Sequence, residues 1–265
     1  MFRDLAVVMD GAGTILKMYR VAKDIEKGII MEGVITSELI MKKKGRALVV
    51  PQMDPEVICS FPPDDALGKL IVGREEMLAV SCSSSCIPRE DAINIVLGSQ
   101  ARIRDLIDVH ARVKARCPGN YHTAGLIIDV DCHEVVYAIS TGGTPFSGMK
   151  EVIRDLKDMG ADIFVASGDS MRSLDSLQDL GIGLGQIYPV SSPLKKKEIV
   201  EDLKSRYKQV IMVGDGLNDI YAFQSADLAV LTVQQDTRPA KELLSAADEM
   251  IKDIRELPGV VRRNS

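Results

Sequence analysis

Acidic side chains stand directly after two short apolar runs in this sequence. Asp10 follows the run 5–9, in Leu-Ala-Val-Val-Met-Asp-Gly-Ala-Gly-Thr, and Asp215 and Asp219 follow the run 209–213. Short apolar runs without helical spacing predict buried strands. Because open α/β sheets bind ligands at the carboxyl ends of their strands, these carboxylates predict a binding or catalytic site. The plainer alternatives are that Asp10 opens a turn and that the later pair neutralises a helix start.

Two further segments supply a hydroxyl group and positive charge. The apolar run 162–166 ends in Ser167-Gly168-Asp169, and a lysine triplet at 195–197 follows Pro193 at a predicted helix start. Phosphoryl transfer needs an in-line nucleophile and groups that neutralise spreading negative charge. Carboxylates, a hydroxyl group and an ammonium group, carried by neighbouring elements, suit that chemistry.

Helical patterns alternate with apolar runs between these segments. Helices are expected over 149–159, after Asp169 and from Pro193, with a further strand over 226–231. Residues 237–258 are expected to form helix, short strand and helix. This alternation predicts an α/β fold with a doubly wound parallel sheet. The runs 124–130 and 134–139 predict a hairpin that returns the chain to this core.

In chain order, a strand-end Asp, a strand-end Ser, a helix-start Lys and a strand-end Asp pair resemble the four motifs of the haloacid dehalogenase superfamily. They are more closely similar to the phosphorylation domain of P-type ATPases, whose motifs read Asp-x-x-Gly-Thr, Thr-Gly-Asp, Pro-x-x-Lys and Gly-Asp-Gly-x-Asn-Asp. The resemblance covers residues 5–14 and about 137–250. It implies a Mg²⁺-dependent phosphatase or phosphotransferase with a Rossmann-like core.

The resemblance also implies the catalytic and metal-binding groups. Asp10 would be the nucleophile that forms an aspartyl-phosphate. The implied magnesium site contains Asp10, the backbone carbonyl of Ala12 and Asp215, because Mg²⁺ prefers hard oxygen ligands. Asp219 would hold a metal-bound water or orient Lys196, the lysine at the Pro-x-x-Lys spacing.

Phosphate-binding groups follow from the same motifs. Hydrogen-bond donors at a helix start suit an anion, and Lys196 would screen charge between the nucleophile and the phosphate. For Asp169, a contact with metal-bound water and a helix cap remain equal alternatives. The implied phosphate-binding residues are Thr14, Ser167, Gly168 and Asn218, the last of which would also fix the loop that carries Asp215.

One position departs from the superfamily pattern. Most of its phosphatases carry a second Asp two residues after the nucleophile, where this chain has Ala12. A general acid–base group contributes about 10²–10⁴-fold to rate. The departure predicts substrates with good leaving groups, slow phosphate release, or an acid supplied by the inserted segment. It also keeps open an alternative function, a catalytically weak phosphate- or nucleotide-binding regulatory protein.

The first two motifs are separated by a long segment. We expect residues 1–16 and 123–265 to form the catalytic core and residues 17–122 to form an inserted α+β cap, in which no nucleotide-binding signature is readable. Within it, the pattern from Pro88 to Arg116 is the longest helical one. His110 lies in the apolar stripe of that pattern, which favours a packed, hydrogen-bonded histidine over a metal ligand.

Composition narrows the partners. The chain has 265 residues, a net charge of −5 and no Trp, which argue against nucleic acid and anionic membranes as partners. The partner that the resemblance implies is a small phosphorylated substrate. No apolar run approaches the ~20 residues that span a bilayer, and no signal peptide is evident, so a cytoplasmic protein is expected. The oligomeric state is left open.

Cysteine usage gives two readings. The five cysteines are odd in number and irregular in spacing, as is typical of reduced cytosolic thiols. A metal site is the alternative, because Cys82 and Cys86 have suitable spacing. The residues that would complete it are Cys117, His122, Cys132 and His133.

Overall fold

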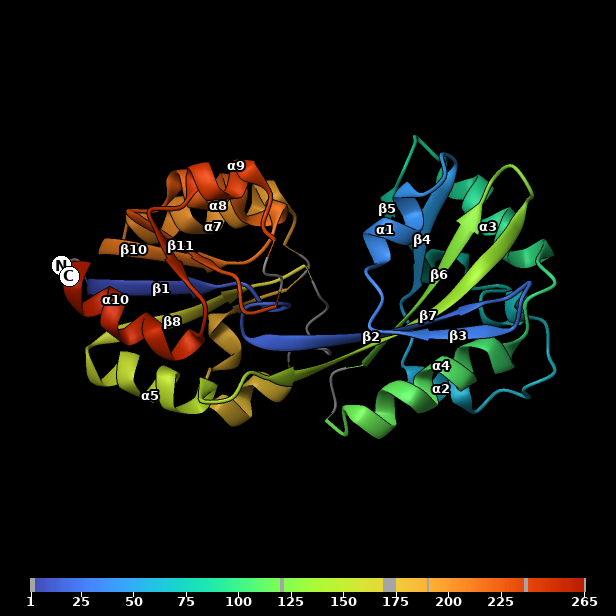
Figure 1. The fold of residues 1–265 in the computed structure, drawn as a ribbon, viewed down its shortest axis with the longest axis horizontal. Helices are drawn as coiled ribbons and strands as arrows, with labels where there is room; N and C mark the ends of the chain where they lie inside the picture. The colour runs from blue at the N-terminus through green and yellow to red at the C-terminus, as the bar shows by residue number, and fades with distance from the viewer. Residues whose placement is uncertain (1–2, 120–121, 169–174, 190, 236–237, 265) are drawn as a thin grey trace. The chain divides into compact units, whose positions relative to one another are not determined.

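The computed structural model shows two compact units joined by two chain crossings (Figure 1). The core unit contains Met1–Met18 and Thr144–Ser265, and the inserted unit contains Tyr19–Gly143. The residues that the structure describes are 3–119, 122–168, 175–189, 191–235 and 238–264.

A parallel sheet with strand order β12-β11-β10-β1-β8-β9 forms the centre of the core unit. The central strand β1 is buried on both faces, as expected for an apolar run between helical layers. Strand β1 lies between β8 and β10, which come much later in the sequence, so the sheet brings distant motifs to one edge. The strands are β1 (Arg3–Met9), β8 (Ala161–Ala166), β9 (Ile187–Tyr188), β10 (Tyr207–Gly214), β11 (Leu228–Thr232) and β12 (Glu249–Ile251).

Helices cover both faces of this sheet (Figure 1). On one face, Ile199, Val200 and Leu203 of α7 pack with Phe223 of α8 and Leu243 of α9 into one hydrophobic cluster. Helices α5 and α10 lie on the other face. The bounds are α5 (Met149–Asp158), α7 (Pro193–Lys204), α8 (Ile220–Ser225), α9 (Lys241–Ala246) and α10 (Leu257–Asn264), with short 3₁₀ turns η3 (Asp175–Leu180), η4 (Leu184–Gln186), η5 (Leu217–Asp219) and η6 (Ile254–Glu256).

The inserted unit is built on a second sheet, with strand order β3-β2-β7-β6-β4-β5. The paired strands whose register is described run antiparallel. One face packs against α2, α3 and α4 through a large apolar cluster, and α1 packs on the other through Leu39 and Ile40. The strands are β2 (Leu16–Asp24), β3 (Ile29–Glu32), β4 (Arg46–Pro51), β5 (Leu78–Ser83), β6 (His122–Asp129) and β7 (Glu134–Pro145), and the helices are α1 (Thr36–Met41), α2 (Pro55–Cys59), η1 (Leu67–Leu70), η2 (Glu75–Met77), α3 (Arg89–Gly98) and α4 (Ile103–Arg116).

The parallel sheet of the α/β prediction is confirmed, and one boundary differs. The expected hairpin forms as β6 and β7, but it belongs to the inserted unit instead of the core unit. The reason is pairing: β6 hydrogen-bonds to β4 and β7 lies beside β2. The insert therefore extends from the expected 17–122 to Tyr19–Gly143.

The long helical pattern of the inserted unit contains a break. Helix α3 ends at Gly98 and α4 begins at Ile103, so the stretch is two helices. His110 of α4 is buried, and its Nδ1 lies 3.4 Å from Ser140 Oγ, as expected of a packed histidine. Burial lowers the pKa of His110. The helices within the described ranges include none that is both long and apolar enough to cross a membrane.

Candidate active site

Strand register brings three of the predicted site residues to one edge of the core sheet. Met9 of β1 pairs with Val213 of β10 and with Val165 of β8. Asp10, Asp215 and Ser167 therefore all follow at the carboxyl ends of these strands. The backbone N–H of Asp10 donates to Val213 O at 2.9 Å, which extends the ladder to Asp10 itself.

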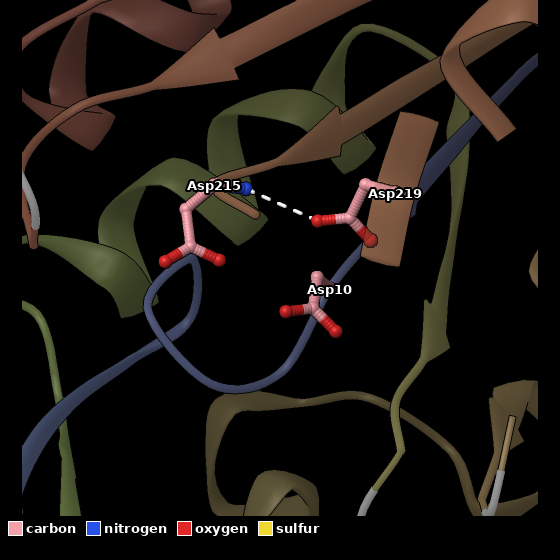
Figure 2. Close-up of side chains that lie close together, drawn as sticks. All are labelled: Asp10, Asp215 and Asp219. Carbon is pink, nitrogen blue, oxygen red and sulfur yellow. Dashed lines mark hydrogen bonds between the residues drawn. The ribbon is translucent and has the colours of Figure 1, made fainter. Parts of the chain in front are cut away.

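Three carboxylates meet at this edge (Figure 2). One ligand oxygen each from Asp10, Asp215 and Asp219 can be chosen so that all lie within 4.8 Å of one another. Asp10 is 3% exposed and Asp219 is fully buried. Within the described ranges, this is the one cluster of at least three His, Cys, Asp or Glu side chains with metal-binding spacing.

Lys196 supplies the positive charge at the acidic cluster. Its Nζ donates to Asp10 Oδ1 at 2.6 Å and to Asp219 Oδ1 at 2.7 Å, and its side chain is fully buried. Ser192 caps α7 by accepting from the backbone N–H of Lys195 at 3.2 Å, which fixes the start of the helix. Lys195 pairs instead with Glu198 near the surface, so the predicted choice of Lys196 agrees with the geometry.

Asp219 accepts hydrogen bonds from three protein donors. Besides Lys196, its Oδ2 accepts backbone N–H bonds from Asp215 and Gly216, each at 3.2 Å. The first of these is the dashed line in Figure 2. Of its two predicted roles, this geometry favours orienting Lys196 over holding a metal-bound water. Asp10 and Asp215 then remain as the carboxylates best placed to share a cation.

The charges at the site are unbalanced, and the pKa values reflect it. Burial, with repulsion from Asp219, raises the pKa of Asp10 to about 7, although Lys196 opposes the shift. For Lys196, burial acts to lower the pKa, but attraction to Asp10 and Asp219 outweighs it and raises the pKa. Lys196 therefore stays protonated, and Asp10 and Asp219 share its ammonium group.

A glycine allows the loop after Asp10 to approach Asp215. Gly13 has φ +84°, in the left-handed region, and a Cβ built on it would lie 1.8 Å from Asp215 Oδ2. Any larger residue would displace the Asp215 carboxylate. The Gly in the first motif is thus required for the acidic cluster as well as for the turn.

The remaining predicted residues lie around the same edge. Ser167 is buried, and its backbone N–H donates to Tyr188 O at 3.1 Å. Thr14 is fully buried, and in the described ranges its Oγ1 is one of two buried side-chain atoms with no hydrogen-bond partner. Gly168 and Asn218 are exposed, and Ala12 is half-buried. Asp169 lies outside the described residues.

The sequence did not predict two residues whose hydrogen bonds support the site, Ser191 and Gln234. Ser191 is buried, donates through its N–H to Ser167 O at 2.8 Å and through Oγ to Tyr188 O at 3.0 Å. Gln234 donates to Thr14 O at 2.9 Å. The available signal for Gln234 was its place just after the buried strand β11, at the carboxyl edge of the sheet.

The donor set fits a divalent, hard cation. Mg²⁺ takes oxygen ligands, and an excess of buried carboxylates over ammonium groups leaves negative charge for it to neutralise. Asp10 and Asp215 supply such oxygens within the same cluster. By contrast, the described cysteines are free thiols and join no such cluster, with Cys82, Cys86 and Cys132 exposed.

Comparison with known proteins agrees with this geometry. Residues 6–227 match the family model described as haloacid dehalogenase-like hydrolase. The soluble P-type ATPase-like phosphatase of Methanocaldococcus jannaschii is 32% identical over 261 residues, which are 98% of this chain and 93% of that protein. The probable copper-importing P-type ATPase A of Enterococcus hirae is 35% identical over 82 residues, 31% of this chain and 11% of the pump.

Solved structures include the catalytic domain of the CPx-ATPase CopB-B, at 16% identity and a TM-score of 0.49, covering 98% of this chain and 89% of that one. The family model spans well over half of the chain, so the chain belongs to the haloacid dehalogenase-like hydrolase family. It is a hydrolase, and the similarity to a P-type-ATPase-like phosphatase that the motifs indicated is confirmed.

Proposed function

We propose that this hydrolase is a Mg²⁺-dependent phosphatase that acts on a small phosphorylated substrate through an aspartyl-phosphate on Asp10. The observation that carries the proposal is the placement of the Asp10 carboxylate. It is buried beside Asp215 and Asp219 and bonded to the Lys196 ammonium group. The name of the Methanocaldococcus relative, aligned over almost the whole chain, supports the same activity.

In the first chemical step, a carboxylate oxygen of Asp10 attacks the substrate phosphorus. The new bond joins that oxygen to phosphorus, and the bond to the leaving group breaks, with the electron pair leaving on the departing oxygen. Lys196 lies against Asp10 and stays charged, so it holds the carboxylate in position and offsets negative charge on the phosphoryl group. The hydroxyl of Thr14 and the backbone around Ser167 and Gly168 would bind phosphoryl oxygens.

In the second step, water attacks the same phosphorus. The bond from phosphorus to the Asp10 oxygen breaks, which releases inorganic phosphate and restores the carboxylate. A magnesium ion held by Asp10, Asp215 and the carbonyl of Ala12 would supply charge neutralisation for both steps. Asp219 holds Lys196 and the backbone of Asp215 and Gly216 in place through its three hydrogen bonds.

Ala12 limits the substrates that this site can use well. It stands where a second carboxylate would protonate a leaving group. Among the described core-unit residues, the nearby acids are engaged: Asp10 with Lys196, and Asp219 with Lys196 and backbone N–H groups. The leaving groups of acyl phosphates, aryl phosphates and nucleoside triphosphates depart without a proton. We therefore propose that the substrate belongs to this group.

Phosphate release from p-nitrophenyl phosphate tests the proposal. Wild-type protein should release phosphate steadily only when Mg²⁺ is present, and Asp10→Asn and Asp215→Asn should each abolish release. Asp202→Asn is a matched control, because Asp202 is an exposed acid paired with Arg206. Wild-type protein that binds phosphate but never turns over would overturn the proposal in favour of a regulatory phosphate-binding protein.

A further inference from the structure

The loop that follows β11 reaches back to the segment after Asp10 with two consecutive glutamines. Gln234 Nε2 donates to Thr14 O at 2.9 Å, and Gln234 Oε1 accepts from the backbone N–H of Ile254 at 3.0 Å. Gln235 Oε1 accepts from the N–H of Met18 at 2.7 Å, and its Nε2 donates to Met18 O at 3.4 Å. All of these residues lie in the core unit.

The segment held by these glutamines is a tight loop that carries the site. Gly11 O accepts from the N–H groups of Ile15 and Leu16 at 3.0 and 2.9 Å, and Leu16 O accepts from Gly13 N–H at 2.8 Å. The loop therefore folds on itself between Asp10 and Met18. Its contacts with the rest of the core unit decide where Thr14 points.

Thr14 is the residue of this loop that is prepared for a ligand. Its side chain is fully buried, yet its Oγ1 has no hydrogen-bond partner within the described ranges. A buried hydroxyl without a partner costs free energy, so its retention beside the acidic cluster indicates a bond that forms on binding. The bond from Gln234 to Thr14 O fixes the backbone at the same residue.

We propose that Gln234 is a positioning residue for phosphate binding, holding Thr14 so that its hydroxyl meets a phosphoryl oxygen. Gln235 anchors the end of the same loop at Met18, where its side-chain amide bonds both the N–H and the carbonyl of the backbone, as a residue on a paired strand would. This inference rests on the proposed function, because it takes the edge around Asp10 as the phosphate site. It adds the β11 loop to the parts of the chain on which that site depends.

A purely structural role for Gln234 is separable from this one. The side chain bridges two segments, and only one of its two bonds reaches the active-site loop. Gln234→Glu keeps the acceptor for Ile254 and replaces the donor that faces Thr14 O. Gln234→Met removes both hydrogen bonds and keeps a side chain of similar length. If the link to Ile254 were the part that matters, the Glu variant would behave as wild type.

The experiment measures inorganic phosphate affinity by calorimetry in Mg²⁺, with amide hydrogen exchange at Ile15 and Leu16 in metal-free protein. Gln234→Glu and Gln234→Met should each weaken phosphate binding by about tenfold, since one fixed hydrogen bond is at stake. Both should speed exchange at the two amides. The global unfolding midpoint of Gln234→Glu should stay near that of wild type.

Two controls match these variants. Gln209→Met removes a glutamine bond to the carbonyl of Asn264, far along the sheet from the site. Gln209→Glu adds the same charge as Gln234→Glu and likewise removes an amide donor that faces a backbone carbonyl. Neither control should change phosphate affinity by more than about threefold, because neither removes a hydrogen bond to the loop that follows Asp10.

The outcomes separate this inference from the proposed function. Wild-type phosphate affinity and exchange rates in Gln234→Glu would overturn the positioning role. A loss of affinity in Gln209→Glu as large as that in Gln234→Glu would overturn it too, since an added charge alone would then explain both. If Gln234→Glu weakens phosphate binding while Asp10→Asn still hydrolyses substrate, the inference stands and the proposed nucleophile is wrong.

Discussion

Each unit buries a carboxylate among charged partners. The cluster in the core unit has more acidic than basic groups, whereas the cluster in the inserted unit has equal numbers of each. In the core unit, Asp10 and Asp219 share the ammonium group of Lys196, and Asp215 lies in the same acidic cluster. In the inserted unit, Asp129 accepts from Lys43 at 2.9 Å and from Arg46 at 3.2 Å, with Asp131 bonded to the same lysine. The second cluster pairs two acids with two cations.

The pKa values of the two buried acids move in opposite directions. Burial and Asp219 raise the pKa of Asp10 to about 7. For Asp129, burial acts to raise the pKa, but hydrogen bonds from Lys43 and Arg46 outweigh it and lower the pKa. The balanced cluster therefore stabilises the fold, whereas the unbalanced one costs stability, which is consistent with its proposed role in binding a cation.

The largest expected effect comes from removing the central acid of the unbalanced cluster. Asp10→Asn should lower turnover at least about 10⁴-fold, because no other described group is placed to attack phosphorus. At pH values above 7, metal-free Asp10→Asn should have a higher thermal unfolding midpoint than metal-free wild type. A raised folded-state pKa favours folding fully below the unfolded value of about 3.9, and that contribution is lost as pH rises through 7.

Calorimetric scans of metal-free wild type and Asp10→Asn at pH 5 and pH 8 measure this difference. The stabilisation by Asn should grow with pH. A variant that is destabilised equally at both values would show that the Asp10 carboxylate is satisfied in the folded protein, and the contrast between the clusters would fail.

Adding a carboxylate should sharpen the contrast. Ala12→Asp should speed hydrolysis of alkyl phosphates by up to about 10²-fold, because it supplies a proton for a basic leaving group. It should leave aryl phosphates nearly unchanged, and it should destabilise metal-free protein by worsening the charge imbalance. Steady-state rates on a matched pair of alkyl and aryl phosphates measure the effect. Rapid alkyl hydrolysis by wild type, unaltered in the variant, would refute the missing-acid argument.

The smallest expected effect lies in the balanced cluster. Asp129→Asn should cost about 2 kcal/mol of unfolding free energy at pH 7, since two cations lose a charged acceptor. Because the folded-state pKa is lowered, the stabilisation is complete above the unfolded pKa of about 3.9 and is lost as pH falls through the folded value. Urea unfolding at pH 7 and pH 3 checks this, and a cost that persists at pH 3 would contradict it.

The sequence was most informative where chemistry and strand ends coincide. The apolar runs before Asp10, Ser167 and Asp215 predicted parallel strands, and their register does bring these residues to one edge. Lys196 could be chosen among three lysines by its spacing from Pro193. The roles assigned to these residues in catalysis stay predictions, but their convergence is a property of the fold.

Other features were not readable because they depend on tertiary pairing. The apolar runs 124–130 and 134–139 predict a hairpin but not which sheet it joins, so these strands were placed in the wrong unit. The helix break after Gly98 was hidden by an apolar pattern that continues into α4. The contact of Gln234 with Thr14 joins residues 220 apart in sequence, so the position of Gln234 after a buried strand could suggest a place near the site but not this partner.

Trapping the phosphoenzyme tests the central claim most directly. Wild-type protein would be mixed with acetyl phosphate and Mg²⁺, quenched in acid and digested for peptide mass spectrometry. The account predicts one phosphoryl group on the peptide that contains Asp10, removed by hydroxylamine and absent from Asp10→Asn and from reactions without Mg²⁺. Turnover of acetyl phosphate without any label on Asp10, or with the label on another residue, would contradict it.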